Sequence, residues 1–227
     1  MVETTSGERR GWLFVFEGID GSGKSTQMRR AAATLRARGL PVVELAEPTA
    51  GRFGRQIRML SREGGRRVSP ELELDLFIRD RMEDVEQNIR PALERGDIVL
   101  LDRYFYSTMA YQGARGLDPE DIRRRNESFA CLPDLVLYFR VGVDEAMQRI
   151  QRQRAAAADL FERHDELVLV SEVYDDLARR LDFFHTIDAS ADEDSVARQV
   201  IEAMDRTLAR GRRPVNMNGI HPRHGDV

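Results

Sequence analysis

A glycine-rich loop directly after a short apolar run constrains this chain more than any other feature. Residues 13–16 read Leu-Phe-Val-Phe and predict a buried strand, and residues 18–25 read Gly-Ile-Asp-Gly-Ser-Gly-Lys-Ser. The second segment fits the pattern G-x-x-x-x-G-K-[ST]. In that pattern the glycines let backbone N–H groups turn inward around phosphate oxygens, and the next helix adds its positive dipole end. The chain is therefore expected to bind a nucleotide phosphate between a strand and a helix.

Lys24 is the only lysine of the chain, since 34 of its 35 Lys and Arg residues are arginines. A sequence that uses arginine everywhere else places a compact, flexible ammonium at this one position. We expect Lys24 to reach the β- and γ-phosphates of a triphosphate and the Ser25 hydroxyl to join the coordination shell of Mg²⁺. The predicted phosphate-binding residues are Gly18, Ile19, Asp20, Gly21, Ser22, Gly23, Lys24, Ser25 and Thr26.

Apolar runs alternate with segments of helical periodicity along the rest of the chain. Further strands are predicted at residues 41–45, 97–101, 134–139 and 184–187, and helices at 27–38, 70–94, 119–130, 143–154, 161–182 and 192–210. Strands separated by helices predict an α/β fold with a five-stranded parallel sheet and helices on both faces. Ligands are then expected at the carboxyl ends of the strands.

The length of 227 residues favours one domain, which we place at residues 12–210. Residues 1–11 are expected to be flexible, and the apolar-poor tail 211–227 to be disordered. An alanine run at 155–158 between arginines indicates a small lid over about residues 150–163. The net charge of -4 argues against non-specific nucleic-acid binding. No apolar run approaches the roughly 20 residues that span a bilayer, and a signal-peptide pattern is lacking, so the cytoplasm is the expected compartment.

An aspartate at the end of a second predicted strand indicates which reaction the phosphate loop serves. The strand at 97–101 runs into Asp102-Arg103-Tyr104, where an aspartate can approach the metal held by the loop. Motor-type ATPases usually follow that aspartate with a carboxylate that activates water, whereas Arg103 suits a second anionic group. GTPases need an Asn-Lys-x-Asp motif, which a chain with a single lysine in the phosphate loop excludes. The pattern therefore favours transfer of a phosphoryl group between two bound anions.

With these motifs the chain resembles the thymidylate kinase family, P-loop nucleoside monophosphate kinases that phosphorylate dTMP to dTDP with ATP. The matching segments occur in family order between about residues 12 and 208 and are residues 16–27, 47–49, the helix with Phe77 and Asp80-Arg81, Asp102-Arg103-Tyr104 with Ser107, residues 111–113 and residues 133–135. Shikimate, guanylate and adenylate kinases share the loop but not this set. The resemblance implies the P-loop NTPase fold, ATP and Mg²⁺ as cofactors, dTMP as the small-molecule substrate in dTTP synthesis, and a homodimer.

The resemblance also assigns residues to the monophosphate. Asp20 resembles the aspartate that receives the 3′-hydroxyl of the deoxyribose. Phe77 resembles the aromatic that stacks on thymine, and Arg81, one helical turn later, the arginine that hydrogen-bonds a thymine carbonyl. Arg58 or Arg103 would grip the 5′-phosphate.

The remaining substrate residues lie in two of the other matching segments. Thr108 and Gln112 are spaced one helical turn apart and would read the thymine edge. Tyr111 resembles the tyrosine that crowds the 2′ position and disfavours ribonucleotides. Pro48 would line the sugar and the base.

Catalysis is assigned to Lys24, to Asp102 as a metal partner of Ser25, to Arg103 and to an arginine of the lid. Residues 19–22 contain no arginine, so the chain resembles family members whose catalytic arginine lies in the lid. The family lid commonly reads Asp-Arg-Phe-Glu, whereas residues 159–162 read Asp-Leu-Phe-Glu, with Leu160 in the arginine position. We predict that Arg154 supplies the charge; the other candidates are Arg149, Arg152 and Arg163.

Two alternatives remain open from the sequence. The phosphate loop is equally compatible with a related kinase that acts on another nucleoside monophosphate. Phe77, Arg81 and Gln112 argue against that alternative. It is also compatible with a nucleotide-binding regulator without turnover, for which the departure at Leu160 is the only support. The sequence does not decide the oligomeric state or the role of the tail.

Overall fold

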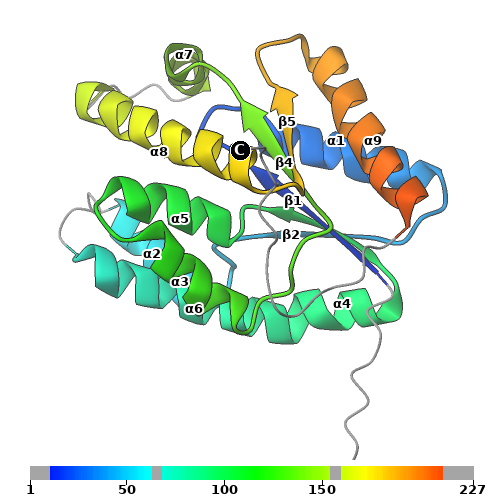
Figure 1. Ribbon diagram of the computed structural model, residues 1–227, viewed down its shortest axis with the longest axis horizontal. Helices are drawn as coiled ribbons and strands as arrows, with labels where there is room; N and C mark the ends of the chain where they lie inside the picture. Colours follow the sequence, from blue (N-terminus) through cyan, green and yellow to red (C-terminus); the bar gives the residue numbers. More distant parts are fainter. Residues whose placement is uncertain (1–10, 63–67, 154–159, 212–227) are drawn as a thin grey trace, which may run out of the picture.

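The computed structural model describes residues 11–62, 68–153 and 160–211, and its centre is a five-stranded sheet (Figure 1). The strand order is β2-β3-β1-β4-β5, and each neighbouring pair is parallel. The strands are β1 (Trp12–Glu17), β2 (Val42–Ala46), β3 (Ile98–Asp102), β4 (Leu135–Arg140) and β5 (Phe184–Asp188). The predicted parallel sheet is confirmed, and each strand begins and ends within one residue of its predicted bounds.

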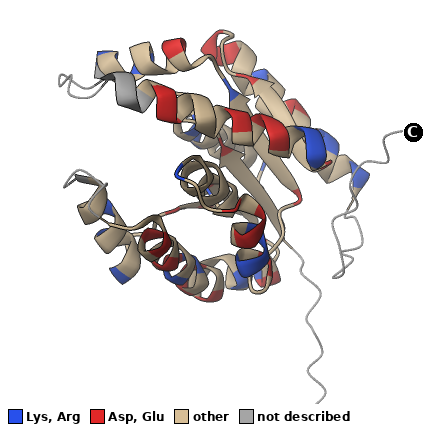
Figure 2. Ribbon diagram, turned by 60° about the vertical axis from the view of Figure 1, so that its left-hand side comes forward, with Lys and Arg blue, Asp and Glu red and all other residues tan. Residues whose placement is uncertain are grey.

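Helices cover both faces of this sheet, as predicted. They are α1 (Lys24–Ala37), α2 (Arg52–Arg62), α3 (Pro70–Asp84), the π-helical turn η1 (Val85–Ile89), α4 (Arg90–Arg95), α5 (Phe105–Ala114), α6 (Pro119–Glu127), α7 (Val143–Gln153), α8 (Leu160–Arg180) and α9 (Glu193–Arg210). Figure 1 shows α1 and α9 side by side on one face, while α4 and α8 pack on the other with α5 against α8. Figure 2 shows basic and acidic residues interspersed along these helices. Among the helices in the described ranges, none is long and apolar enough to cross a membrane.

The sequence prediction missed two helices and treated a third as uninterrupted. Helix α5 was missed because most of its residues are buried on every side, so its sequence has no polar face to mark the helical period. Helix α2 is amphipathic, with apolar residues such as Phe53 and Ile57 between arginines, and the prediction overlooked this pattern. The helix predicted over 70–94 is interrupted by η1, where the N–H of Arg90 donates to the carbonyl of Val85. Pro91 lacks an N–H, and a wide turn accommodates its ring.

The sheet register brings the phosphate loop to the second predicted motif. Phe16 at the end of β1 is paired with Asp102 at the end of β3, and the N–H of Arg103 donates to the carbonyl of Phe16 at 3.0 Å. Strands β1, β3 and β4 are almost wholly buried, so the position of these two ends is set by the core. The loop after β1 and the turn after β3 therefore form one continuous edge.

Parts of the predicted lid and both predicted flexible ends lie outside the described residues. These parts are residues 154–159 of the lid, residues 1–10, and residues 212–227. Gly11, the last residue of the predicted flexible N-terminus, is buried, and its N–H donates to the carbonyl of Leu93 at 2.6 Å.

Candidate active site

The phosphate loop joins β1 to α1 through glycines in conformations that other residues rarely adopt. Gly21 and Gly23 have φ angles of 81° and 86°, in the left-handed region. At Gly18 an added Cβ would come within 2.8 Å of the carbonyl oxygen of Phe139. Gly23 is the N-cap of α1 and brings no side chain, so the first N–H groups of the helix stay open to an anion. The backbone therefore has the shape that the sequence motif predicts.

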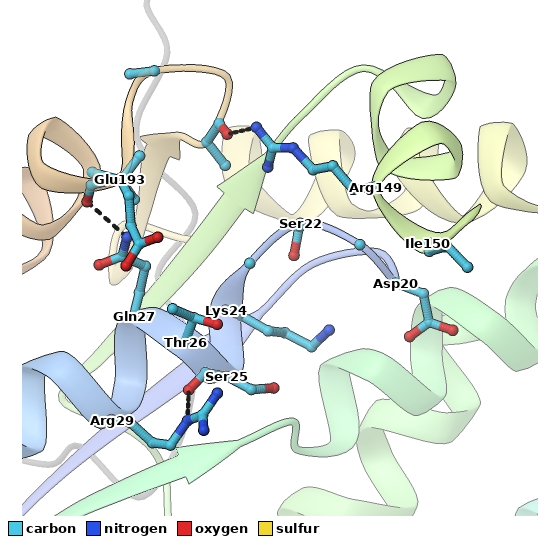
Figure 3. Close-up of a pocket in the computed structure, with 15 residues that line it drawn as sticks. Asp20, Ser22, Lys24, Ser25, Thr26, Gln27, Arg29, Arg149, Ile150 and Glu193 are labelled. Atoms are coloured by element: carbon cyan, nitrogen blue, oxygen red, sulfur yellow. Dashed lines mark hydrogen bonds between the residues drawn. The ribbon is translucent and has the colours of Figure 1, made fainter. Parts of the chain in front are cut away.

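Lys24 lies under this loop and is 6% exposed. Its Nζ is 3.4 Å from the carbonyl oxygen of Ile19, and Figure 3 shows the side chain extending along the loop toward Asp20. Burial and the charge of Arg103 together lower the pKa of Lys24 to about 8, while the charges of Asp20 and Asp102 oppose the shift. A bound phosphate would compensate the buried ammonium.

The two residues predicted to hold Mg²⁺ meet beside the loop. The hydroxyl of Ser25 donates to Oδ2 of Asp102. The other carboxylate oxygen, Oδ1, is buried and has no hydrogen-bond partner among the described residues. A hydroxyl and a carboxylate oxygen are ligands that Mg²⁺ prefers, so the pair fits the ion. Within the part of the chain that the structure describes, no three His, Cys, Asp or Glu side chains gather as a metal centre.

A cavity of about 530 Å³ opens in front of the loop and is large enough for a nucleotide (Figure 3). Its walls are the loop, the first turns of α1, the α7 residues Arg149 and Ile150, and residues between 189 and 196. Arg149 donates to Oε1 of Glu145 at 2.6 Å and to the carbonyl of Ala189 at 2.8 Å. Arg149 therefore ties α7 to the segment after β5 and forms one wall of the cavity.

Arg103 is at the centre of the neighbouring site and has a left-handed φ of 69°. Its guanidinium donates to Asp20 at 2.6 Å, to the Ser107 hydroxyl at 3.0 Å and to the carbonyl of Gly18 at 3.3 Å. It also lies 5.2 Å from the ring centroid of Tyr111, whose hydroxyl accepts the N–H of Asp20 at 3.2 Å. Three of the predicted substrate residues, Asp20, Arg103 and Tyr111, thus form one cluster. Burial raises the pKa of Tyr111 to about 12, so its hydroxyl keeps its proton.

A second cluster is built around Arg81, which is 1% exposed. Its guanidinium donates to Glu47 at 2.8 Å, to Oδ1 of Asn126 at 2.6 Å and to the Thr108 hydroxyl at 3.1 Å. Burial raises the pKa of Glu47 to about 8, and the charge of Arg81 opposes the shift. The structure thus brings together Arg81 and Thr108, two predicted base-reading residues. In the same contacts Arg81 joins the end of β2 to α3, α5 and α6.

The amide of Gln112 is oriented by a third set of contacts. Its Nε2 donates to Glu73 at 3.1 Å, and Glu73 also accepts a hydrogen bond from Arg115. The carbonyl oxygen of Gln112 lies 3.5 Å from the same arginine. Glu73 and Arg115 therefore decide which edge of the amide is a donor and which is an acceptor.

The other predicted substrate residues lie on the half-buried surface of α2, α3 and the end of β2. Phe77 is half-buried on α3, and Arg58 donates to the carbonyl of Pro48 at 2.8 Å. The turn after β2 is held by Asp80, which accepts the N–H of Thr49 at 2.7 Å and its hydroxyl at 2.6 Å.

Four acidic or amide residues that organise these contacts had no predicted role. Glu47 and Asp80 belong to segments that carry the family resemblance, so the sequence offered a signal for them. Glu73 and Asn126 carry no local signal, because a buried polar residue on a helix is not distinguished by sequence from an exposed one.

The lid arginines are placed only in part. Arg154, the predicted catalytic residue, lies outside the described residues, as does the side chain of Arg163. Arg152 is exposed on α7, and Arg149 is bound to Ala189 as described above. The assignment to Arg154 stays a prediction.

Comparison with known proteins agrees with this geometry. Residues 16–200 match the family model described as Thymidylate kinase. The chain is 45% identical to a thymidylate kinase of Akkermansia muciniphila over 199 residues, which cover 88% of this chain and 94% of the relative. It is 41% identical to one of Desulfotalea psychrophila over 198 residues, covering 87% and 96%. It is 47% identical to one of Xanthomonas euvesicatoria pv. vesicatoria over 199 residues, covering 88% and 85%.

Proposed function

The chain belongs to the thymidylate kinase family and phosphorylates dTMP to dTDP, and we propose that it uses Mg-ATP as the donor, in the synthesis of dTTP. The observation that carries this proposal is the shared edge of the sheet. On that edge the phosphate loop with Lys24 adjoins the turn after β3, and Asp20 of the loop forms one cluster with Arg103 and Tyr111. Two anions can be bound there with their phosphates adjacent.

On the donor side, the triphosphate of ATP would lie against the N–H groups of the loop and the ammonium of Lys24. The nucleoside would occupy the cavity beside Arg149. Ser25 and Asp102 would hold Mg²⁺, which supplies positive charge to the phosphate oxygens when bound. Lys24 is buried, so solvent would screen little of the attraction between its ammonium and the phosphates.

On the acceptor side, Asp20 would accept the 3′-hydroxyl, and Tyr111 would lie against the 2′ carbon. Arg103 would hold the 5′-phosphate, whose oxygens would take the place of some of the contacts that its guanidinium makes with Gly18 and Asp20. Phosphoryl transfer then needs alignment of the two phosphates and neutralisation of their oxygens more than covalent help from the protein. We assign the remaining positive charge to Arg154 of the lid.

The base would be read by the residues around Arg81. Phe77 would stack on thymine, while Arg81, Thr108 and Gln112 would face its polar edge. Pro48 would line the sugar and the base, and Arg58 would support the phosphate. The orientation of the Gln112 amide by Glu73 supports this assignment, because an amide that reads a base must present a defined donor or acceptor. By family resemblance we also expect a homodimer in the cytoplasm. Size-exclusion chromatography with light scattering tests the dimer.

The test is a coupled assay of ADP release with dTMP, dUMP, UMP, CMP, GMP and AMP, each with Mg-ATP. We expect the highest kcat/KM with dTMP and the next highest with dUMP, which lacks only the methyl group. A higher kcat/KM with any other monophosphate would assign the chain a different substrate. ATP binding without ADP release for all six would favour a regulator without turnover.

A further inference from the structure

Glu17 is a buried carboxylate at the end of β1 that the reaction described above does not use. It is 0% exposed and immediately precedes the phosphate loop. One oxygen accepts the N–H groups of Tyr104 at 2.8 Å and Ser107 at 3.2 Å. The other accepts the hydroxyls of Ser107 at 2.5 Å and Tyr174 at 2.8 Å. Four donors therefore occupy the carboxylate, which leaves it no free position to take a proton from a substrate.

A carboxylate at this position is costly for stability alone. Removing an ionised group from water costs free energy, and well-packed apolar residues often replace buried ion networks without loss of stability. Burial raises the pKa of Glu17, whereas the hydrogen bonds from Ser107 and Tyr174 and the charge of Arg103 lower it. Burial of the Glu17 carboxylate is therefore unfavourable, and hydrogen-bond donors near Arg103 compensate for it. This arrangement indicates that Glu17 does more than fill the core.

The bonds of Glu17 hold the turn that carries Arg103. The left-handed conformation of Arg103 is strained for a residue other than glycine, so the surrounding contacts must maintain it. The next residue, Tyr104, is the N-cap of α5 and makes no side-chain capping bond of its own. Glu17 supplies the missing acceptor from the neighbouring strand, because it binds the N–H groups of Tyr104 and Ser107. The Ser107 hydroxyl then links Glu17 directly to the Arg103 guanidinium.

We propose that Glu17 is a positioning residue for phosphoryl transfer, which acts through the start of α5 and the Ser107 hydroxyl to hold the Arg103 guanidinium between Gly18 and Asp20. This inference rests on the proposed function, in which Arg103 binds the acceptor phosphate. Tyr174 extends the network to α8, the helix that begins at Leu160 within the predicted lid.

The test is a double-mutant cycle between Glu17→Gln and Arg103→Ala. Glutamine keeps the shape but replaces one acceptor oxygen by a donor, which the hydroxyls of Ser107 and Tyr174 face. We expect kcat to fall by about tenfold or more in Glu17→Gln, since displacement of a reacting group by about 1 Å can cost 100-fold. The KM for ATP should change by less than about twofold, because the bonds of Glu17 go to α5 and α8 rather than to the loop.

In the Arg103→Ala background, Glu17→Gln should lower kcat by less than about twofold further. A purely structural Glu17 would lower kcat by the same factor in both backgrounds, and that result would overturn the proposal. The cycle is measured with the monophosphate that the wild type turns over fastest. A preference other than dTMP would contradict the proposed function without affecting the cycle.

Two milder variants test the same network if Glu17→Gln folds poorly. Ser107→Ala removes the link to Arg103, and we expect kcat to fall by about tenfold. Tyr174→Phe removes one donor and should lower kcat by about threefold. Tyr138→Phe is the matched control, because its ring lies 5.2 Å from that of Tyr174 but its hydroxyl donates to Asp175. Unchanged kcat in Ser107→Ala, or equal losses in Tyr174→Phe and Tyr138→Phe, would contradict the proposed role.

Discussion

The donor and acceptor sides of this site are built in opposite ways. The proposed donor side is one continuous stretch, residues 18–26, where backbone N–H groups of the loop and of the first turn of α1 would face the phosphates. The acceptor side uses side chains from separate elements, with Arg81 bonded to Glu47, Thr108 and Asn126 in the interior. An anion site made of backbone can change its side chains without disturbing the core. The proposed base-reading site is made of buried side chains bonded to one another, so it is also part of what holds the helices together.

Substitution of Arg81 should have the largest effect, and the effect should be on stability. Arg81→Ala leaves Glu47 buried without its partner, which typically costs about 3–5 kcal/mol of unfolding free energy. The matched control is Arg79→Ala on the same helix, whose exposed pair with Asp75 should be worth about 1 kcal/mol or less. Urea denaturation of both variants measures the difference. Equal losses would show that the Arg81 cluster is not a structural centre.

Substitution of Lys24 should instead affect turnover. Lys24→Arg places a bulkier planar group under the loop, and we expect kcat to fall by about 100-fold or more, as when a transition-state donor is removed. The loss of unfolding free energy should be smaller than in Arg81→Ala, because the Lys24 side chain borders the cavity. Arg36→Lys, at an exposed residue of the same helix outside the cavity lining, is the control. Near-normal turnover of Lys24→Arg would contradict the functional role of the single lysine.

The same contrast explains what the sequence could predict. The strands, the loop and the Asp102-Arg103 turn carry local signals, namely apolar runs and short motifs, and the structure places them together. Helix α5 was missed because it is buried on all sides, so its sequence lacks the helical alternation of polar and apolar residues. Glu17, Glu73 and Asn126 bind partners 39 to 157 positions away along the chain, so no local pattern announces them. Family resemblance identified Arg81, but not that its donors are bonded within the protein.

The lid gives a third, smaller test on the donor side. We expect Arg154→Ala to lower kcat by at least about tenfold, a barrier change near 1.4 kcal/mol, and the added change Leu160→Arg to recover part of it. Arg179→Ala, at an exposed arginine in the last turn of α8, is the control. Arg149→Ala should raise the KM for ATP more than it lowers kcat, because Arg149 forms the cavity wall with Ala189. A silent Arg154→Ala without rescue would make Arg149 or Arg163 the next candidate.

The smallest effect should come from a change in pH. A rise in pH should remove charge from the donor side and favour charge on the acceptor side. Lys24 has a pKa lowered to about 8, so its ammonium is charged below that pH and neutral above it. Burial instead raises the pKa of the Glu47 carboxyl, so on the acceptor side a rise in pH favours the carboxylate that pairs with Arg81.

Raising the pH from 7 to 8.5 lowers the charged fraction of Lys24 from about nine tenths to about one quarter, so kcat/KM for ATP should fall about fourfold. The pH profile of kcat/KM reports the free enzyme, in which no phosphate raises the pKa of the ammonium again. In Lys24→Arg the guanidinium stays charged throughout, and the break near pH 8 should disappear even though overall activity is low. A break that persists in that variant would assign the titration to another group. An unchanged kcat/KM for ATP up to pH 9 in the wild type would show that the buried ammonium keeps its proton without phosphate.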